Sequence, residues 1–173
     1  YADVRDNTTW KLLEDLELLR THLQVHSWLL FGGSWGSTLA LAYAEQHPVQ
    51  TRGLVLRGIF LCTQREIDWF LHGMGRFFPE HHERFVSHLG RGESAGLLQA
   101  YHSQLTNPDP EIHLPAARAW CEYETACSTL LPQDPVQSDG PSNPDLAMAR
   151  LEAHYFVNRG FFTDGGIIQH AKR

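Results

Sequence analysis

The sequence WLLFGGSWGSTLALAYAEQHP, residues 28–48, decides the fold of this chain. Its first four residues form an apolar run typical of a strand, and its second half has the spacing of a helix that ends before Pro48. Between them lies Gly32-Gly33-Ser34-Trp35-Gly36, a Gly-x-Ser-x-Gly turn. Between a strand and a helix, this turn is typical of a nucleophile elbow, which lifts a serine hydroxyl clear of a sheet. We expect Gly32 and Gly36 to be required because Cβ atoms there would collide with neighbouring backbone.

The surrounding residues favour an elbow over the alternative, a glycine-rich turn with an ordinary serine. Leu39, Ala42 and Tyr43 fall on one face of the following helix. Residues 53–57, Gly-Leu-Val-Leu-Arg, then have the pattern of a buried strand. Strand, elbow, helix and strand form the right-handed unit of a parallel sheet. An amphipathic helix that covers one face of the sheet is indicated before it by Trp10, Leu12, Leu13, Leu16, Leu19 and Leu23.

The fold class is therefore predicted to be α/β, with part of a parallel sheet followed by an all-helical segment. We expect a partial core with the elbow at 1–61, a helical cap at 62–162 and a return towards the core at 163–173. Such an insertion after a strand is typical of a lid over the carboxyl ends of the strands, and a separate helical bundle is the alternative. Because two strands are too few for a stable parallel sheet, the chain is interpreted as an internal piece of a longer protein. Helices are expected at Glu66–Leu71, Pro79–Leu89, Ser94–Leu105, Pro110–Leu130, Pro144–Val157 and Ile167–Lys172.

Composition excludes some classes of function. The 173 residues carry a net charge of −6 and no basic run, which argues against nucleic acid or an anionic membrane as the main partner. No apolar run approaches the ~20 residues that a membrane span needs. The cysteines, Cys62, Cys121 and Cys127, are odd in number and lack CxxC spacing. This favours reduced thiols in the cytoplasm, with neither a metal nor a disulfide framework.

The histidines do not complete a catalytic site by themselves. A serine nucleophile on such an elbow needs an acid and a histidine after it in chain order. No histidine after His47 follows a strand pattern with a suitable acid before it, and His154 and His170 are interpreted as surface or hydrogen-bonded helix residues. The run His81-His82-Glu83 could indicate a metal, but adjacent helix positions do not share a face, which favours a solvated surface.

The chain resembles the bacterial proline iminopeptidases, which are serine peptidases of the α/β-hydrolase fold. The resemblance covers essentially the whole chain. It implies release of an N-terminal proline from peptides without a metal or cofactor, and it implies that the second oxyanion loop, the catalytic acid and the histidine lie outside this chain, which alone would be inactive. The motifs that carry it are Asn-Thr-Thr-Trp10, Phe-Gly-Gly-Ser-Trp-Gly-Ser37, Leu-Ala-Leu-Ala-Tyr43, His47-Pro48, Leu-Val-Leu-Arg-Gly-Ile-Phe60, Asp68-Trp-Phe70, Ala-Arg-Ala-Trp120 and His-Tyr-Phe-Val157.

The same resemblance implies the roles of individual residues. Ser34 matches the nucleophile, and Trp35 matches the residue whose N–H helps to bind the oxyanion. Glu124 and Glu152 resemble two cap glutamates that hold the substrate amine, and paired carboxylates would bind such a cation strongly. The apolar walls around the proline ring are matched by Phe60, Trp69, Phe70 and Phe156. Two alternatives stay open: an esterase or amidase of other specificity, and a non-catalytic peptide-binding protein. The oligomeric state is not predicted.

Overall fold

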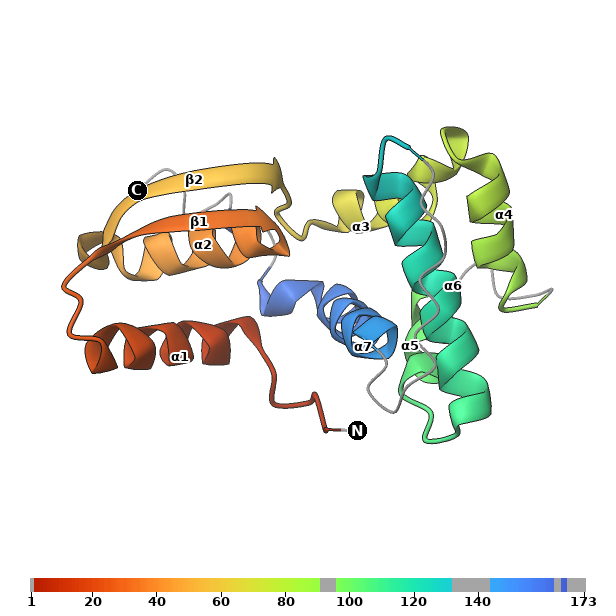
Figure 1. Ribbon diagram of the computed structural model, residues 1–173, viewed down its shortest axis with the longest axis horizontal. Coiled ribbons are helices and arrows are strands. Elements are labelled where there is room, and N and C mark those ends of the chain that lie inside the picture. Colours follow the sequence, from red (N-terminus) through yellow and green to blue (C-terminus); the bar gives the residue numbers. More distant parts are fainter. Residues whose placement is uncertain (1, 91–95, 132–143, 164–165, 168–173) are drawn as a thin grey trace. The chain divides into compact units, whose positions relative to one another are not determined.

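The computed structural model describes residues 2–90, 96–131, 144–163 and 166–167 (Figure 1). Its contacts divide the chain into two compact units. The first consists of Tyr1–Ile67 and Asn158–Arg173, and the second is Asp68–Val157. The helical segment expected at 62–162 extends beyond the second unit at both ends.

The first unit contains the predicted strand, elbow, helix and strand. Strand β1 (Trp28–Ser34) leads into helix α2 (Trp35–Gln46), and a short 3₁₀ helix, η1 (Pro48–Gln50), precedes strand β2 (Thr51–Ile59). The two strands pair in parallel. A strand and a parallel partner joined through a helix form the unit from which α/β sheets are built, so the predicted fold class is confirmed.

Among the described residues of the first unit, helices cover one face of this strand pair. Helix α2 packs on both strands, and helix α1 (Thr9–His22) packs on α2 at the same side (Figure 1). On the other face Leu29, Phe31 and Val55 are exposed, Phe31 to 73%. The expectation of a buried strand at 53–57 is therefore wrong for this chain. A single connecting helix can shield one face of a parallel pair, whereas such strands are buried only when helices lie on both faces.

Helix α1 is held to the unit near its start. Near its start, Thr9 donates a hydrogen bond from Oγ1 to the carbonyl of Gly160 at 2.6 Å, and Trp10 donates from Nε1 to that of Phe161 at 3.1 Å. These acceptors belong to η3 (Arg159–Phe161), which returns the chain to the first unit. The apolar core between the helices contains Leu13, Ala42, Tyr43 and Ile167.

At the middle of α1, Glu17 accepts hydrogen bonds from Arg20 and from the hydroxyl of Tyr43 in α2. The bond from Arg20, helped by that from Tyr43, lowers the pKa of Glu17 from 4.5 to about 2 against the opposing effect of burial. We expect Glu17→Gln to lower the free energy of unfolding at pH 7 by about 1–3 kcal/mol, because it removes the charged acceptor of the Arg20 guanidinium. Urea titrations followed by circular dichroism measure this difference.

The pH dependence of this effect follows from the lowered pKa. The carboxylate stabilises the folded chain above pH 4.5, and that contribution is lost as the pH falls towards 2, so wild type and E17Q should converge in acid. Glu14→Gln is the matched control, since Glu14 pairs with Lys11 on the exposed side of the same helix and should change stability by less than about 0.5 kcal/mol. An equal loss at pH 7 and at pH 3 would contradict the assignment.

The second unit is helical, as predicted. Helix α6 (Pro110–Ser128) lies at its centre and packs on α4 (Pro79–Ser87), α5 (Leu97–Leu105) and α7 (Pro144–Val157). The helix α3 (Gln64–Leu71) enters this unit from the first, and a 3₁₀ helix, η2 (Gly73–Arg76), follows it.

The predicted helix limits hold to within a few residues. Helix α7 has the predicted bounds, α3 begins two residues early, and α4 and α6 each end two residues early. Residues 94–95 of the helix predicted at Ser94–Leu105 and residues 168–172 of the one predicted at Ile167–Lys172 lie outside the described part of the chain. None of the described helices is both long and apolar enough to cross a membrane.

Stacked aromatic rings form the core of the second unit. Phe85 lies between Tyr101 and Tyr123, with ring centroids 4.4 Å from each. Trp120 on α6 packs edge-on against Phe85 and is fully buried. Each buried aromatic ring removes a large apolar area from water, and offset rings attract further, so this stack fixes α4, α5 and α6 against one another.

Candidate active site

Ser34, the expected nucleophile, lies at the junction of β1 and α2 with an unusual backbone conformation. Its φ is 53° and its ψ −124°, and its side chain makes no capping hydrogen bond to the helix. A serine with positive φ is strained, and such strain persists only where the surrounding structure enforces it. The residue is exposed, so the turn presents the Ser34 hydroxyl instead of burying it.

The two glycines of the motif differ in how much space surrounds them. A Cβ added at Gly32 would lie 2.2 Å from the carbonyl oxygen of Gly36, so no other residue fits there without moving the backbone. A Cβ added at Gly36 would meet no atom of the described residues within 4 Å. The expected collision is thus confirmed at Gly32 and wrong at Gly36, because the turn folds the chain over Gly32 alone.

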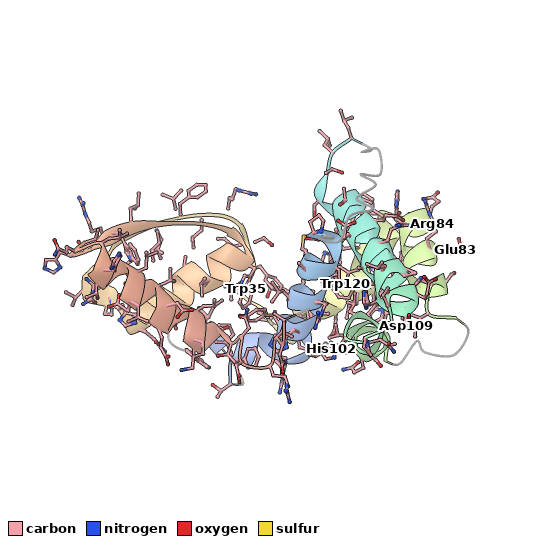
Figure 2. The ribbon with its side chains drawn as sticks, turned by 60° about the horizontal axis from the view of Figure 1, so that its bottom comes forward. Trp35, Glu83, Arg84, His102, Asp109 and Trp120 are labelled. Atoms are coloured by element: carbon pink, nitrogen blue, oxygen red, sulfur yellow. The ribbon has the colours of Figure 1, made fainter. Side chains whose placement is uncertain are left out.

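Helix α2 begins directly after Ser34, and Figure 2 labels Trp35 at its start. The first N–H groups of a helix have no acceptor within the helix, and the macrodipole makes this end positive. An oxygen that gains negative charge beside Ser34 is therefore favoured, which suits the expected role of the Trp35 N–H.

Two buried hydroxyl groups in the first turn of α2 bind the chain that follows β2. Ser37 donates from Oγ to the carbonyl of Ser34 at 2.7 Å and accepts from the N–H of Phe60 at 3.0 Å. Thr38 donates from Oγ1 to the carbonyl of Phe60 at 2.5 Å. Sequence reasoning assigned Ser37 and Thr38 only to the start of a helix, since nothing local shows that their partner lies more than twenty residues later.

The chain after Phe60 is held by a carboxylate. Glu66 accepts hydrogen bonds from the N–H groups of Leu61 and Thr63 and from the hydroxyl of Thr63, while its own N–H donates to that hydroxyl. This is a capping box at the start of α3, and its sequence signal is the spacing Thr63-x-x-Glu66. It fixes the segment that leads from β2 into the helices.

In the second unit, Glu124 on α6 and Glu152 on α7 are both partly buried. Trp120 donates from Nε1 to Oε2 of Glu152 at 2.6 Å. Burial raises the pKa of both carboxyl groups, and the charge of Glu124 raises that of Glu152 further, to about 8. The Trp120 bond opposes this rise without overcoming it. Two carboxyl groups that interact in this way form a site whose empty state favours a bound proton and whose ionised state favours a cation.

Two of the expected wall residues lie beside this pair. The Phe70 ring is 5.7 Å from that of Phe156 and 5.5 Å from that of Trp120, and Trp120 and Phe156 are 6.1 Å apart. Helices α3, α6 and α7 thus bring Phe70, Phe156 and Glu152 together around the indole of Trp120, which Figure 2 labels. Trp120 itself was not predicted as a site residue. A buried indole N–H that needs an acceptor was the available signal.

Of the other two expected wall residues, Trp69 belongs to the second unit and Phe60 to the first. Trp69 is 48% exposed and lies against Phe77, with ring centroids 6.1 Å apart. Phe60 belongs to the first unit, where the hydroxyl groups of α2 hold its backbone.

The run His81-His82-Glu83 does not converge on one point. The Nε2 of His82 lies 2.9 Å from the carbonyl of Leu71, and its ring packs on Tyr123, so the expectation of a solvated face is wrong for His82. Glu83 is exposed on α4 (Figure 2). Within the described ranges no group of three or more His, Cys, Asp or Glu side chains could hold a metal ion.

Of the two later histidines, His154 is buried on α7, where its ring packs on Tyr155. Of the two positions expected for His154, the surface one is wrong, whereas the expected place on a helix is confirmed by α7. His170 lies outside the described residues.

Comparison with known proteins agrees with the geometry of the elbow. A model of the alpha/beta hydrolase fold family matches residues 3–121, which include β1, the elbow, α2 and β2. The chain belongs to the α/β-hydrolase fold family. In an α/β-hydrolase the serine of a Gly-x-Ser-x-Gly turn is the nucleophile, with an acid and a histidine later in the chain. The described histidines after β2 of this α/β-hydrolase chain all lie in the helical unit.

Several curated proteins similar to this chain are proline iminopeptidases. The chain is 48% identical over 165 residues to the proline iminopeptidase of Arabidopsis thaliana, covering 94% of this chain and 43% of that protein. It is 47% identical to that of Neisseria gonorrhoeae, with 93% and 52% covered, and 45% identical to that of Xylella fastidiosa strain Temecula1, with 100% and 56% covered. The chain therefore spans about half the length of the curated relatives it matches.

Proposed function

We propose that the whole protein containing this chain is a serine aminopeptidase that releases proline from the N-terminus of peptides, and that Ser34 is its nucleophile. The observation that carries the proposal is the strained, exposed Ser34 between β1 and α2. The names of the relatives support the choice of substrate.

The proposed reaction is acyl transfer. Ser34 Oγ attacks the carbonyl carbon of the N-terminal proline and gives its proton to a histidine supplied from outside this chain. The oxyanion is held at the N-terminus of α2 by the Trp35 N–H and by a second donor, also from outside the chain. The histidine then protonates the leaving amine, and water hydrolyses the acyl-enzyme to free proline.

Recognition of the free N-terminus is assigned to Glu124 and Glu152. A terminal amine has a pKa near ~8 and is cationic at neutral pH, whereas an internal amide is neutral. A pair of buried carboxyl groups with raised pKa values distinguishes the two, because the bound cation replaces the proton that the empty pair retains. The helical unit thus supplies selectivity for exopeptidase substrates.

Binding of the substrate's proline ring is assigned to aromatic side chains. Phe70 and Phe156 lie beside the Trp120 that holds Glu152, which supports a position near the bound amine. We propose Phe60 and the exposed Trp69 as further wall residues on the resemblance to the relatives. We also place the protein in the cytoplasm, supported by the free thiols of all three cysteines.

The test compares three substrates of the whole protein: a prolyl arylamide, an alanyl arylamide and a simple acyl ester. A proline aminopeptidase should give the highest kcat/KM with the prolyl arylamide, and should leave the N-acetylated form of that compound intact. Preference for the ester would favour an esterase. A fluorophosphonate probe addresses the remaining alternative, since a peptide-binding protein without chemistry should not be modified at Ser34.

A further inference from the structure

The end of strand β2 departs from the regular parallel ladder. Gly33 pairs with Arg57, but Ser34 pairs with Ile59, so Gly58 is an extra residue on β2. Its φ of 50° is one that glycine adopts without strain. A bulge of this kind redirects the strand that carries it, and bulges are common beside active sites. Beyond Ile59, β2 has no further partner in β1, so another element must hold Phe60.

That element is the first turn of α2. The N–H of Phe60 donates to Ser37 Oγ at 3.0 Å, and its carbonyl accepts from Thr38 Oγ1 at 2.5 Å. Both polar groups of this peptide are therefore satisfied by side chains three and four residues after Ser34. The same Ser37 hydroxyl donates to the carbonyl of Ser34 at 2.7 Å. One hydroxyl thus links the expected nucleophile to Phe60.

Helix capping, the usual role of serine and threonine at a helix start, does not explain the bonds from Ser37 and Thr38 to Phe60. Serine and threonine near a helix start commonly cap their own helix. Here the Ser37 hydroxyl, besides its local bond to the carbonyl of Ser34, accepts from the N–H of Phe60, and the Thr38 hydroxyl donates to the carbonyl of Phe60. Both residues are fully buried. Burying a hydroxyl group costs free energy unless the group is hydrogen-bonded. The two buried hydroxyl groups therefore favour the one position of Phe60 at which both are bonded.

We propose that Ser37 and Thr38 are positioning residues that hold Phe60 at a set place beside the nucleophile turn, and that this placement contributes to the preference for an N-terminal proline over an N-terminal alanine. The inference rests on the proposed function, in which Ser34 attacks and Phe60 contacts the proline ring. A wall residue hydrogen-bonded to the rigid first turn that follows the nucleophile keeps the ring aligned with the attacking oxygen. Small displacements of a substrate relative to the attacking atom have large effects on the reaction rate.

The test is Thr38→Val in the whole protein, which keeps the side-chain shape and removes the donor to Phe60. The ratio of kcat/KM for prolyl over alanyl arylamide should fall about tenfold, mainly through a higher KM for the prolyl substrate. The rate of labelling by a small fluorophosphonate, which makes no use of the wall, should stay within about twofold of wild type. Loss of folded protein would lower both turnover rates and the extent of labelling in proportion, and would leave the ratio unchanged.

Two further variants sharpen the result. T38S keeps the hydroxyl and should restore most of the ratio. T51V is the matched control, because Thr51 donates a similar bond to the carbonyl of His47 at the other end of α2, and its loss should not change the ratio. If T38V does not fold, S37A replaces it: the ratio should again fall, together with the labelling rate, since Ser37 also binds the carbonyl of Ser34.

A folded T38V or S37A with the wild-type ratio would overturn the inference while leaving the proposed function intact. A wild-type protein that is labelled at Ser34 but prefers other substrates to prolyl arylamide would instead contradict the proposed function, and the inference with it.

Discussion

Replacing Ser34 by alanine in the whole protein is expected to abolish proline release. Removal of a serine nucleophile alone lowers kcat on the order of 10⁶-fold in enzymes of this chemistry, because histidine and acid cannot act without it. The fold should survive, since Ser34 is exposed and its hydroxyl makes no capping bond to α2. Steady-state hydrolysis of prolyl arylamide measures the loss, and circular dichroism reports the fold.

The matched control for this variant is Ser103→Ala. Ser103 is an exposed serine on α5, so its replacement should leave kcat within about twofold of wild type. Fluorophosphonate labelling gives a second reading, because S34A should lose it and S103A should keep it. More than about 1% residual turnover in a clean S34A preparation would remove Ser34 from the nucleophile role.

The second large effect is expected for Glu152→Gln. If the carboxylate binds the substrate amine, its loss removes a charge-assisted hydrogen bond of about 1.5–3 kcal/mol, so kcat/KM for prolyl arylamide should fall roughly 10- to 100-fold. Glutamine keeps the shape and the acceptor for the Trp120 N–H, which separates the loss of charge from a loss of packing. An uncharged acyl ester should be hydrolysed as well by E152Q as by wild type.

Glu122→Gln is the control for charge alone. Glu122 lies two residues before Glu124 on α6 but is exposed, so its neutralisation changes the net charge without changing the buried pair. Equal losses for E122Q and E152Q would indicate long-range electrostatics in place of a contact with the amine. Unchanged kinetics in E152Q would remove its assignment to the substrate.

The raised pKa of Glu152 also predicts how stability varies with pH. Burial and the charge of Glu124 raise this pKa from 4.5 to about 8, so the folded chain retains a proton that the unfolded chain releases. Stability from this group is complete below pH 4.5 and is lost as the pH rises through about 8. E152Q has no such loss. Its free energy of unfolding relative to wild type should therefore be higher at pH 9 than at pH 5, as urea titrations can measure.

Local patterns predicted the parts of the fold that depend on neighbours in the chain. The elbow follows from Gly32-Gly33-Ser34, and α7 has the predicted bounds because proline at 144 and apolar spacing mark a helix without outside help. The exposed sheet face was not predictable from residues 53–57, because an apolar run has the same pattern whether or not a second layer covers it.

The sequence allowed residues of the candidate site to be proposed, but it did not show which hydrogen-bond partners would hold them. Ser34 was predicted from the turn between strand and helix, and Glu152 from resemblance to a family. The indole that holds Glu152 comes from α6, thirty-two residues earlier. The partners of Ser37 and Thr38 lie at residue 60. Hydrogen bonds over such separations leave no periodic signal, since each depends on how the elements pack.

The amino-acid sequence by itself determined the turn at Ser34, the alternation of helix and strand around it, and the helical character of most of the later chain. These follow from backbone sterics and from the spacing of apolar side chains, both of which act over a few neighbours. Only the tertiary structure decided that α2 binds Phe60 through two buried hydroxyl groups and that Trp120 holds one carboxyl group of a pair with a raised pKa. Burial sets both outcomes, because a polar group acquires a required partner, or an altered pKa, only when packing removes its water.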